Sequence, residues 1–196
     1  MDNIFERYPQ LKCCEKDIEK GLKLIIEAYK NNGKVLVCGN GGSAADSEHI
    51  VGELMKGFLL KREVSDHRLS DDLKQNIQGA LPAISLCSQT ALMTAFNNDL
   101  NPDYVFAQQV YGYAKENDLL IAISTSGNSK NVLKAVEVAN AIGIKTLALT
   151  GGNGGKIKEM ATVTITAPSN ETYKIQEYHL PIYHYLCGMV EKEFFE

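Results

Sequence analysis

The chain has 196 residues, of which 44% are hydrophobic and 22% charged, a composition typical of one globular domain and not of a disordered, collagen-like or coiled-coil chain. Twenty Lys and Arg against 24 Asp and Glu give a net charge of −4, which offers no support for nucleic-acid binding. No uncharged apolar run approaches the roughly 18–20 residues of a membrane span, and the acidic, mixed start MDNIFERYPQ is not a signal peptide. Five cysteines without a C-x-x-C pair favour reduced thiols, so we expect a cytoplasmic protein that binds neither membrane nor nucleic acid.

The hydrophobic pattern predicts alternating helices and strands along the chain. An N-terminal helix is expected over 3–32, ending at Asn31-Asn32-Gly33. Short apolar runs predict buried strands at 34–39, 82–86, 119–124, 146–151 and 162–168. Helical patterns fall at 43–58, about 88–97, 104–116, 129–142, 154–160 and about 172–194. Strands that are apolar on both faces and alternate with helices predict a single doubly wound α/β domain over 1–196, with a five-stranded parallel sheet flanked by helices.

One connection interrupts this alternation of strands and helices. Residues 59–81 are long and polar for a helix-to-strand connection, where a few residues are typical. The segment is either a lid over a binding site or a solvated insertion. Its polarity favours the insertion.

The first strand end carries a glycine-rich turn. Ligands of doubly wound sheets bind beyond the carboxyl ends of the strands. In CGNGGSAADSEH (38–49) four turn residues precede a helix: Gly39, Asn40, Gly41 and Gly42. Exposed backbone N–H groups at a helix start suit an anionic ligand, although a turn without a ligand stays open. Gly39, Gly41 and Ala44 also fit the dinucleotide fingerprint, but no acidic residue ends a convincing next strand, so a nicotinamide or flavin site is disfavoured.

The strand end at 123–131, ISTSGNSKN, gathers hydroxyl groups just before a helix. The four hydroxyl residues are Ser124, Thr125, Ser126 and Ser129. Ordinary N-capping by Ser126 or Asn128 needs only one such side chain, so the surplus favours a phosphate site. The later LTGGNGGKIKEM (148–159) is one residue short of a P-loop and has Ile157 where the magnesium-binding hydroxyl belongs, so it predicts only a tight turn.

Two helices carry side chains suited to metal or proton chemistry. His49 and Glu53 are spaced i, i+4 on one face, and Gln176 and His184 are spaced i, i+8 on the C-terminal helix. If the helices meet, these side chains form a metal site with nitrogen and oxygen ligands or an acid/base pair. Otherwise they are polar surface or interface residues. Covalent hydrolase chemistry has no support, because no G-x-S-x-G is present and no cysteine has a catalytic setting.

Together these segments resemble the sugar isomerase (SIS) domain family. The stretches CGNGGSAADSEHIVGEL, AFNND, AISTSGNSKNVLKA, LALTGGNGGK and KIQEYHLPIYH carry the resemblance, which covers nearly the whole chain in the same order. Within the family they are most similar to the phosphoheptose isomerases. A related replication-initiation regulator of the same fold usually has Asn where this chain has His184.

The resemblance implies a function and a role for each matching residue. The reaction would convert sedoheptulose 7-phosphate into D-glycero-D-manno-heptose 7-phosphate through an enediol(ate), for nucleotide-heptose and surface-glycan (lipopolysaccharide or capsule) synthesis. The positions matched to substrate binding are Asn40, Gly41, Gly42, Asn98, Asp99, Ser124, Thr125, Ser126, Ser129 and Gln176. The positions matched to one zinc ion are His49, Glu53, Gln176 and His184, with Glu53 and His184 also the acid/base pair.

The resemblance also implies an assembly, and it leaves an alternative. The family forms homotetramers with active sites between subunits and uses no nucleotide cofactor. The alternative function is that of a non-catalytic SIS protein, a sugar-phosphate sensor or a replication-initiation regulator.

Two departures from the family pattern concern substrate recognition. Tyr173 and Lys174 replace an acidic and basic pair that often precedes the glutamine. A substrate-contacting arginine expected near the start of 59–81 has no clear match, and Lys56, Lys61 and Arg62 are the candidates to replace it.

Overall fold

The structure, a computed structural model that describes residues 4–196, has a parallel five-stranded sheet with the order β2-β1-β3-β4-β5. The strands are β1 (Val35–Cys38), β2 (Ala83–Ser85), β3 (Leu119–Ile123), β4 (Lys145–Gly151) and β5 (Val163–Ala167). Each lies within or next to a predicted apolar run. The doubly wound α/β fold predicted from the sequence is therefore confirmed.

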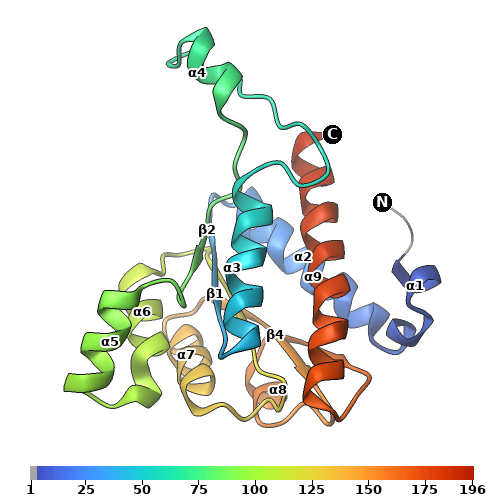
Figure 1. The fold of residues 1–196 in the computed structure, drawn as a ribbon, viewed down its shortest axis with the longest axis vertical. Coiled ribbons are helices and arrows are strands. Elements are labelled where there is room, and N and C mark those ends of the chain that lie inside the picture. The colour runs from blue at the N-terminus through green and yellow to red at the C-terminus, as the bar shows by residue number, and fades with distance from the viewer. Residues whose placement is uncertain (1–3) are drawn as a thin grey trace.

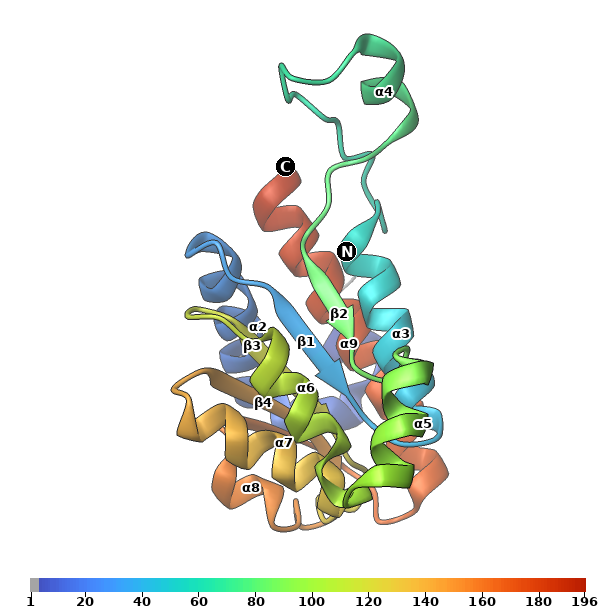
Figure 2. The same cartoon turned by 90° about the vertical axis from the view of Figure 1, so that its left-hand side faces the viewer.

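Helices cover both faces of the sheet (Figures 1 and 2). One face packs against α2 (Glu15–Lys30), α3 (Gly42–Met55) and α9 (Thr172–Phe195), and the other against α5 (Thr90–Asp99), α6 (Val105–Tyr113), α7 (Lys130–Ala141) and α8 (Ile157–Met160). Along β1, Val35 and Val37 enter the first core while Leu36 and Cys38 enter the second, because successive strand residues point to opposite faces. This is why the strands are apolar throughout. Among residues 4–196, every helix is too short or too polar to cross a lipid bilayer.

The N-terminal helix expected over 3–32 is divided, which corrects that prediction. Residue 3 lies outside the described residues. The chain continues as α1 (Ile4–Arg7) and a 3-10 helix η1 (Pro9–Cys14), and the long helix α2 begins only at Glu15. Proline lacks an N–H and disfavours helical backbone in the residue before it, and Tyr8 accordingly has φ −129° and ψ 76°.

The strand order locates the expected binding crevice. β1 lies between β2 and β3, so the connections that follow β1 and β3 leave the sheet in opposite directions. In flavodoxin-like sheets of this order, the gap between those two connections is the ligand-binding switch point. Here the gap lies between the loop at 39–42 and the loop at 124–129.

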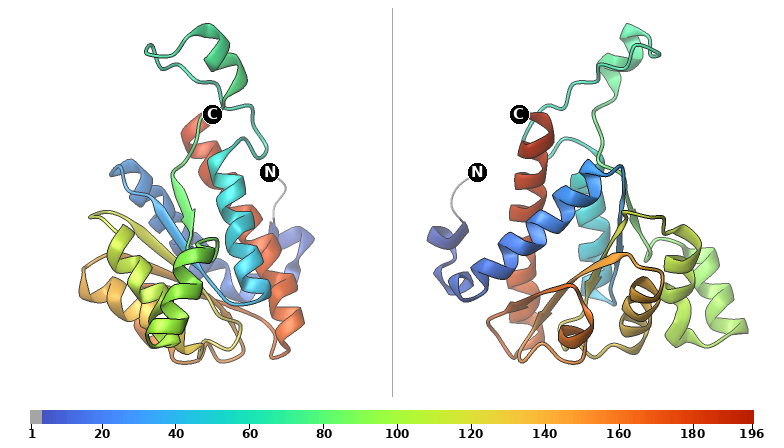
Figure 3. Two further views of the ribbon diagram at one scale, coloured as in Figure 1. Left: turned by 60° about the vertical axis from the view of Figure 1, so that its left-hand side comes forward. Right: turned by 180° about the vertical axis from the view of Figure 1, so that it is seen from behind.

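Residues 59–81, here called the arm, project from the body of the molecule (Figures 1 and 3). The arm carries the short helix α4 (Asp71–Asn76), none of whose residues is buried. It leaves from the end of α3, a 14-residue helix that spans about 21 Å and begins at the carboxyl edge of the sheet. The arm thus points away from the loops of its own chain, as a solvated insertion would and a lid over those loops would not.

A buried ion pair fastens the base of the arm. The side chains of Arg62 and Glu191 are both 0% exposed, and Arg62 Nε donates to Glu191 Oε1 at 2.8 Å. The remaining guanidinium nitrogens of Arg62 donate to the carbonyl groups of Glu53 and Leu54. Burial alone raises the pKa of the Glu191 carboxyl. The N–H groups of Phe58 and Leu59 and the Arg62 guanidinium lower it by more than burial raises it, so the pKa lies below its ordinary value. Arg62 is therefore committed to the fold and is not available to contact substrate.

His179 is a structural residue of α9. It is 0% exposed, and its Nε2 lies 3.1 Å from the carbonyl oxygen of Thr150. Burial lowers the pKa of His179 from its ordinary value of 6.5 to about 4, opposed by that hydrogen bond. The imidazole is therefore neutral near neutral pH.

Replacing Arg62 with Ala is expected to lower the free energy of unfolding by about 3–5 kcal/mol, because the buried Glu191 carboxylate loses its counter-charge. The measurement is urea-induced unfolding followed by circular dichroism. Arg68→Ala is the matched control, since Arg68 pairs with Asp66 on the exposed arm and its loss should change little. Equal unfolding free energies for the two variants would contradict the anchoring role.

The folded protein should lose stability in acid through His179. The folded pKa lies below the unfolded one, so this contribution is complete above about pH 6.5 and is lost as the pH falls toward 4. Between pH 7 and 4.5 we expect wild type to lose roughly 2–3 kcal/mol more than His179→Gln, which keeps an amide donor but does not titrate. Parallel pH profiles of unfolding free energy for the two proteins would refute this.

Candidate functional site

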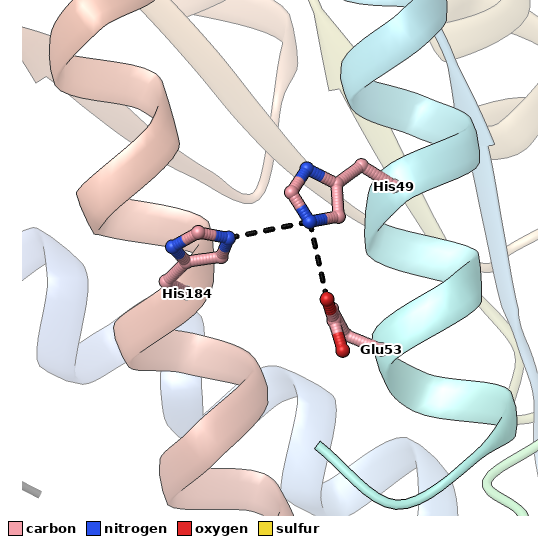
Figure 4. Close-up of side chains that lie close together, drawn as sticks. All are labelled: His49, Glu53 and His184. Atoms are coloured by element: carbon pink, nitrogen blue, oxygen red, sulfur yellow. Dashed lines mark hydrogen bonds and ion pairs between the residues drawn. The ribbon is translucent and has the colours of Figure 1, made fainter. Parts of the chain in front are cut away.

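Three side chains converge between α3 and α9 (Figure 4). His49 and Glu53 lie one turn apart on α3, and His184 reaches them from α9. The Nε2 atom of His49 is 3.1 Å from Glu53 Oε1 and 3.4 Å from His184 Nε2. A ligand atom of each residue lies within 4.8 Å of the others. The helices therefore do meet, and the expected pairing of His49 and Glu53 with His184 is present.

The donor set and spacing of this trio fit a divalent metal ion. Two imidazole nitrogens and a carboxylate oxygen are ligands that zinc accepts at about 2.0–2.2 Å. Nitrogen ligands at two corners of such a tetrahedron would be about 3.3–3.4 Å apart, which matches the separation of the two Nε2 atoms. The side chain of His49 is 42% exposed and that of Glu53 14%, so an ion and a substrate can both reach the trio.

The surroundings of the trio fix its protonation. Burial, then the neighbouring His49, lowers the pKa of His184, while Glu53 raises it, so the net pKa is lowered. The hydroxyl of Tyr183 lies 3.0 Å from His49 Nδ1 and donates to Asp46 at 3.2 Å. Burial, followed by Asp46, raises the pKa of Tyr183, which therefore stays a hydroxyl. His184 is thus a neutral imidazole near pH 7, able to bind a metal or accept a proton.

A cavity of about 510 Å³ opens beside His184. It lies between α1, α9 and the residues that follow α3, and it is lined by Ile4, Arg7, Tyr8, Phe58, Leu59, Leu180, Pro181, His184 and Tyr185. Most of these side chains are apolar or aromatic. The trio thus borders an accessible, mainly apolar space.

The loop after β1 is held in an open turn at the start of α3. Gly41 has φ +58°, a conformation that L side chains rarely adopt, and forms the N-cap. Asn40 and Asn131 exchange two amide hydrogen bonds, at 2.8 and 2.9 Å, which join this loop to the start of α7. The two loops at the switch point therefore form one unit.

The loop after β3 gathers four hydroxyl groups at the start of α7. Ser129 is the N-cap of α7, yet its side chain makes no capping bond. Its Oγ instead lies 3.0 Å from Ser124 Oγ. Thr125 and Ser126 line a separate cavity of about 300 Å³. Ser124 and Ser126 also accept local backbone N–H bonds, from Ser129 and Asn128. A cap needs only one such side chain, so the number of hydroxyls still favours the anion-binding interpretation.

The other residues expected in the site lie on α9 and at the end of α5. A Cβ on Gly42 would be 2.7 Å from Gln176 Nε2, so the Gln176 amide lies against the start of α3, about 12 Å of helix rise before His184. Its place among metal ligands stays a prediction. Asn98 and Asp99 are exposed at the end of α5 and hydrogen bond to each other, and their substrate role is likewise a prediction.

Two residues near His49 are not among those predicted from the sequence: Tyr183, which contacts His49, and Asp46, which contacts Tyr183. One signal was available: Asp46 precedes His49 by three positions and so shares its helix face. For Tyr183 there was none, because its approach to His49 depends on how α9 packs.

Comparison with known proteins adds to this geometry. Residues 3–151 match the family model for the SIS domain. The phosphoheptose isomerase of Citrifermentans bemidjiense is 43% identical, over 91% of this chain and 84% of that protein. That of Helicobacter pylori (strain P12) is 41% identical, over 94% of this chain and 88% of that protein.

A solved structure agrees with the sequence relatives. The structure of a phosphoheptose isomerase from Francisella tularensis superposes with a TM-score of 0.80 at 34% identity, covering 96% of this chain and 94% of that one. The resemblance drawn from the motifs is therefore confirmed. This chain belongs to the SIS domain family and, within it, is most similar to the phosphoheptose isomerases.

Proposed function

We propose that this chain is an aldose–ketose isomerase that converts sedoheptulose 7-phosphate into D-glycero-D-manno-heptose 7-phosphate. The observation that carries the proposal is the convergence of His49, Glu53 and His184 between α3 and α9. A non-catalytic sugar-phosphate sensor would need the phosphate loop but not an acid/base pair. The product would enter nucleotide-heptose and surface-glycan synthesis.

The reaction moves one proton between neighbouring carbons. A base removes a proton from C1 of the ketose, and the electrons of that C–H bond form the C1–C2 double bond. The carbonyl oxygen O2 takes the displaced electron pair and a proton, which gives an enediol. Reprotonation at C2, with loss of the O1 proton, gives the aldehyde at C1 and a hydroxyl at C2. Such a transfer needs one group to carry the carbon-bound proton and another to manage charge on oxygen.

Glu53 and His184 suit these two tasks. One carboxylate oxygen of Glu53 faces His49, and the other is 3.5 Å from Lys56 Nζ, so the group is held from two sides. We assign Glu53 as the base that takes the carbon-bound proton. His184 serves as the acid for oxygen: it takes the proton that O1 loses and gives a proton to O2. The reverse assignment, with His184 as the base for carbon and Glu53 as the acid for oxygen, is the alternative.

His49, Glu53 and His184 would hold a single zinc ion, with Gln176 as the further ligand that the resemblance implies. A bound divalent ion supplies polarisation of the substrate carbonyl and stabilises negative charge on its oxygen. The nitrogen and oxygen donors and their spacing support this choice of group.

The loops at the switch point would bind the rest of the substrate. Ser124, Thr125, Ser126 and Ser129 would accept the phosphate with the N–H groups at the start of α7. Asn40, Gly41 and Gly42 would contact the sugar, and Asn98 and Asp99 its hydroxyls. The Lys56 ammonium replaces the missing arginine most simply, because it is exposed and already lies beside Glu53.

The assembly and location are also proposals. A homotetramer with active sites between subunits would cover the mainly apolar cavity beside His184. The cytoplasm is the compartment that five free cysteines favour.

Glu53→Gln and His184→Ala should each reduce turnover of sedoheptulose 7-phosphate by at least about 100-fold, because each removes a proton-transfer group. The assay follows the sugar by proton NMR in heavy water, where an aldoheptose phosphate is expected. Deuterium enters C2 in the molecules whose proton on Glu53 exchanges with solvent before it is returned to carbon. A chelator should reduce the rate and added zinc should restore it. Glu48→Gln, the same change on an exposed residue of α3, and His67→Ala on the arm are the matched controls.

Full activity in Glu53→Gln or His184→Ala would contradict the proposed mechanism. Binding of the sugar phosphate by wild type without any turnover would instead favour the sensor function.

A further inference from the structure

The hydroxyl of Tyr183 stands between His49 and a carboxylate. Tyr183 lies on α9 directly before His184 and is 2% exposed. Its ring packs edge-on against both imidazoles, with centroids 5.4 Å from that of His49 and 5.1 Å from that of His184. Packing therefore holds the hydroxyl in place, 3.0 Å from His49 Nδ1 and 3.2 Å from Asp46 Oδ1.

Counting hydrogens decides the direction of these two bonds. Tyr183 has one hydroxyl hydrogen, and an ionised Asp46 can only accept. When Tyr183 donates to Asp46, its oxygen is left to accept from His49, so His49 must carry a hydrogen on Nδ1. A neutral imidazole with that hydrogen has its lone pair on Nε2.

The lone pair then points where a cation would lie. His49 Nε2 faces Glu53 Oε1 and His184 Nε2, two further electron-rich atoms. Three such atoms repel one another unless a positive charge lies among them. In the opposite tautomer, His49 Nε2 would carry a hydrogen and donate it to Glu53. Nε2 would then have no lone pair with which to bind a metal ion.

We propose that Asp46 and Tyr183 form a hydrogen-bond relay that fixes the Nδ1–H tautomer of His49 and so keeps Nε2 available to a metal ion. The inference rests on the proposed function, since it concerns the same metal site. Asp46 and Tyr183 are positioning residues that act through His49. Partners that orient a metal-binding histidine typically change metal affinity by 10–100-fold when removed.

The test measures the affinity of the purified protein for Zn²⁺ and Co²⁺ by competition with a chromophoric chelator. Tyr183→Phe keeps the ring but removes the acceptor, and should bind both ions about 10–100-fold more weakly. Asp46→Asn, at a half-buried position that spares the core, should weaken binding in the same direction. Tyr29→Phe is the matched control, because it removes a buried tyrosine hydroxyl that bonds to Pro82 instead.

A second readout reports the tautomer itself. Nitrogen NMR of ¹⁵N-histidine-labelled, metal-free protein at about pH 8, where an ordinary imidazole is neutral, should show His49 protonated on Nδ1 in wild type. Tyr183→Phe should lose that preference, an effect that loss of packing alone would not produce.

The outcomes separate the relay from the proposed function. If wild type binds the ions and Tyr183→Phe binds them with the same affinity as wild type and Tyr29→Phe, the relay alone is overturned. An Nε2–H tautomer of His49 in wild type would also overturn it. Wild type that binds neither ion would overturn the metal site and the relay with it.

Discussion

The side-by-side packing of α3 and α9 is the contact on which the candidate site depends. The two helices run in the same direction, because Gly42 lies against Gln176, His49 against His184, and the end of α3 meets Glu191 through Arg62. Neither helix holds the trio alone. A shift of one helix along the other by a single residue, about 1.5 Å, would already change the distance between the two imidazoles. The buried pair of Arg62 and Glu191 fixes that register at the far end.

The same helix α3 also relates the trio to the switch point. It begins at the glycine turn beside the loop proposed to bind phosphate and carries His49 seven residues further on, about 10 Å along its axis. One rigid element therefore sets the distance between the proposed phosphate-binding loop and the proposed proton-transfer residues. A ligand with a phosphate at one end and a carbonyl at the other is the kind of molecule that this separation suits.

Much of the fold could be predicted from the sequence, because its signals are local. Continuous apolar runs such as LLIAI at 119–123 predict buried parallel strands, and the Gly and Ser clusters predict the turns that follow them. The error at 3–32 came from a helical pattern that continues through Pro9, where the proline interrupts the backbone.

The site could be predicted only in part, because its contacts join distant segments. The i, i+4 spacing of His49 and Glu53 identifies a shared face, but no local rule brings His184 to it or Tyr183 to His49. Arg62 illustrates the opposite case: the sequence offers it as a substrate contact, and tertiary packing buries it against Glu191.

The proposed isomerase site depends on a metal ion held where α3 packs on α9. Anomalous diffraction at the zinc edge, from crystals grown with zinc and sedoheptulose 7-phosphate, tests it most directly. We expect one peak about 2.0–2.2 Å from the Nε2 atoms of His49 and His184 and from a carboxylate oxygen of Glu53, with sugar density beside it. Zinc bound only elsewhere, or no peak between the two helices, would contradict the proposed metal site.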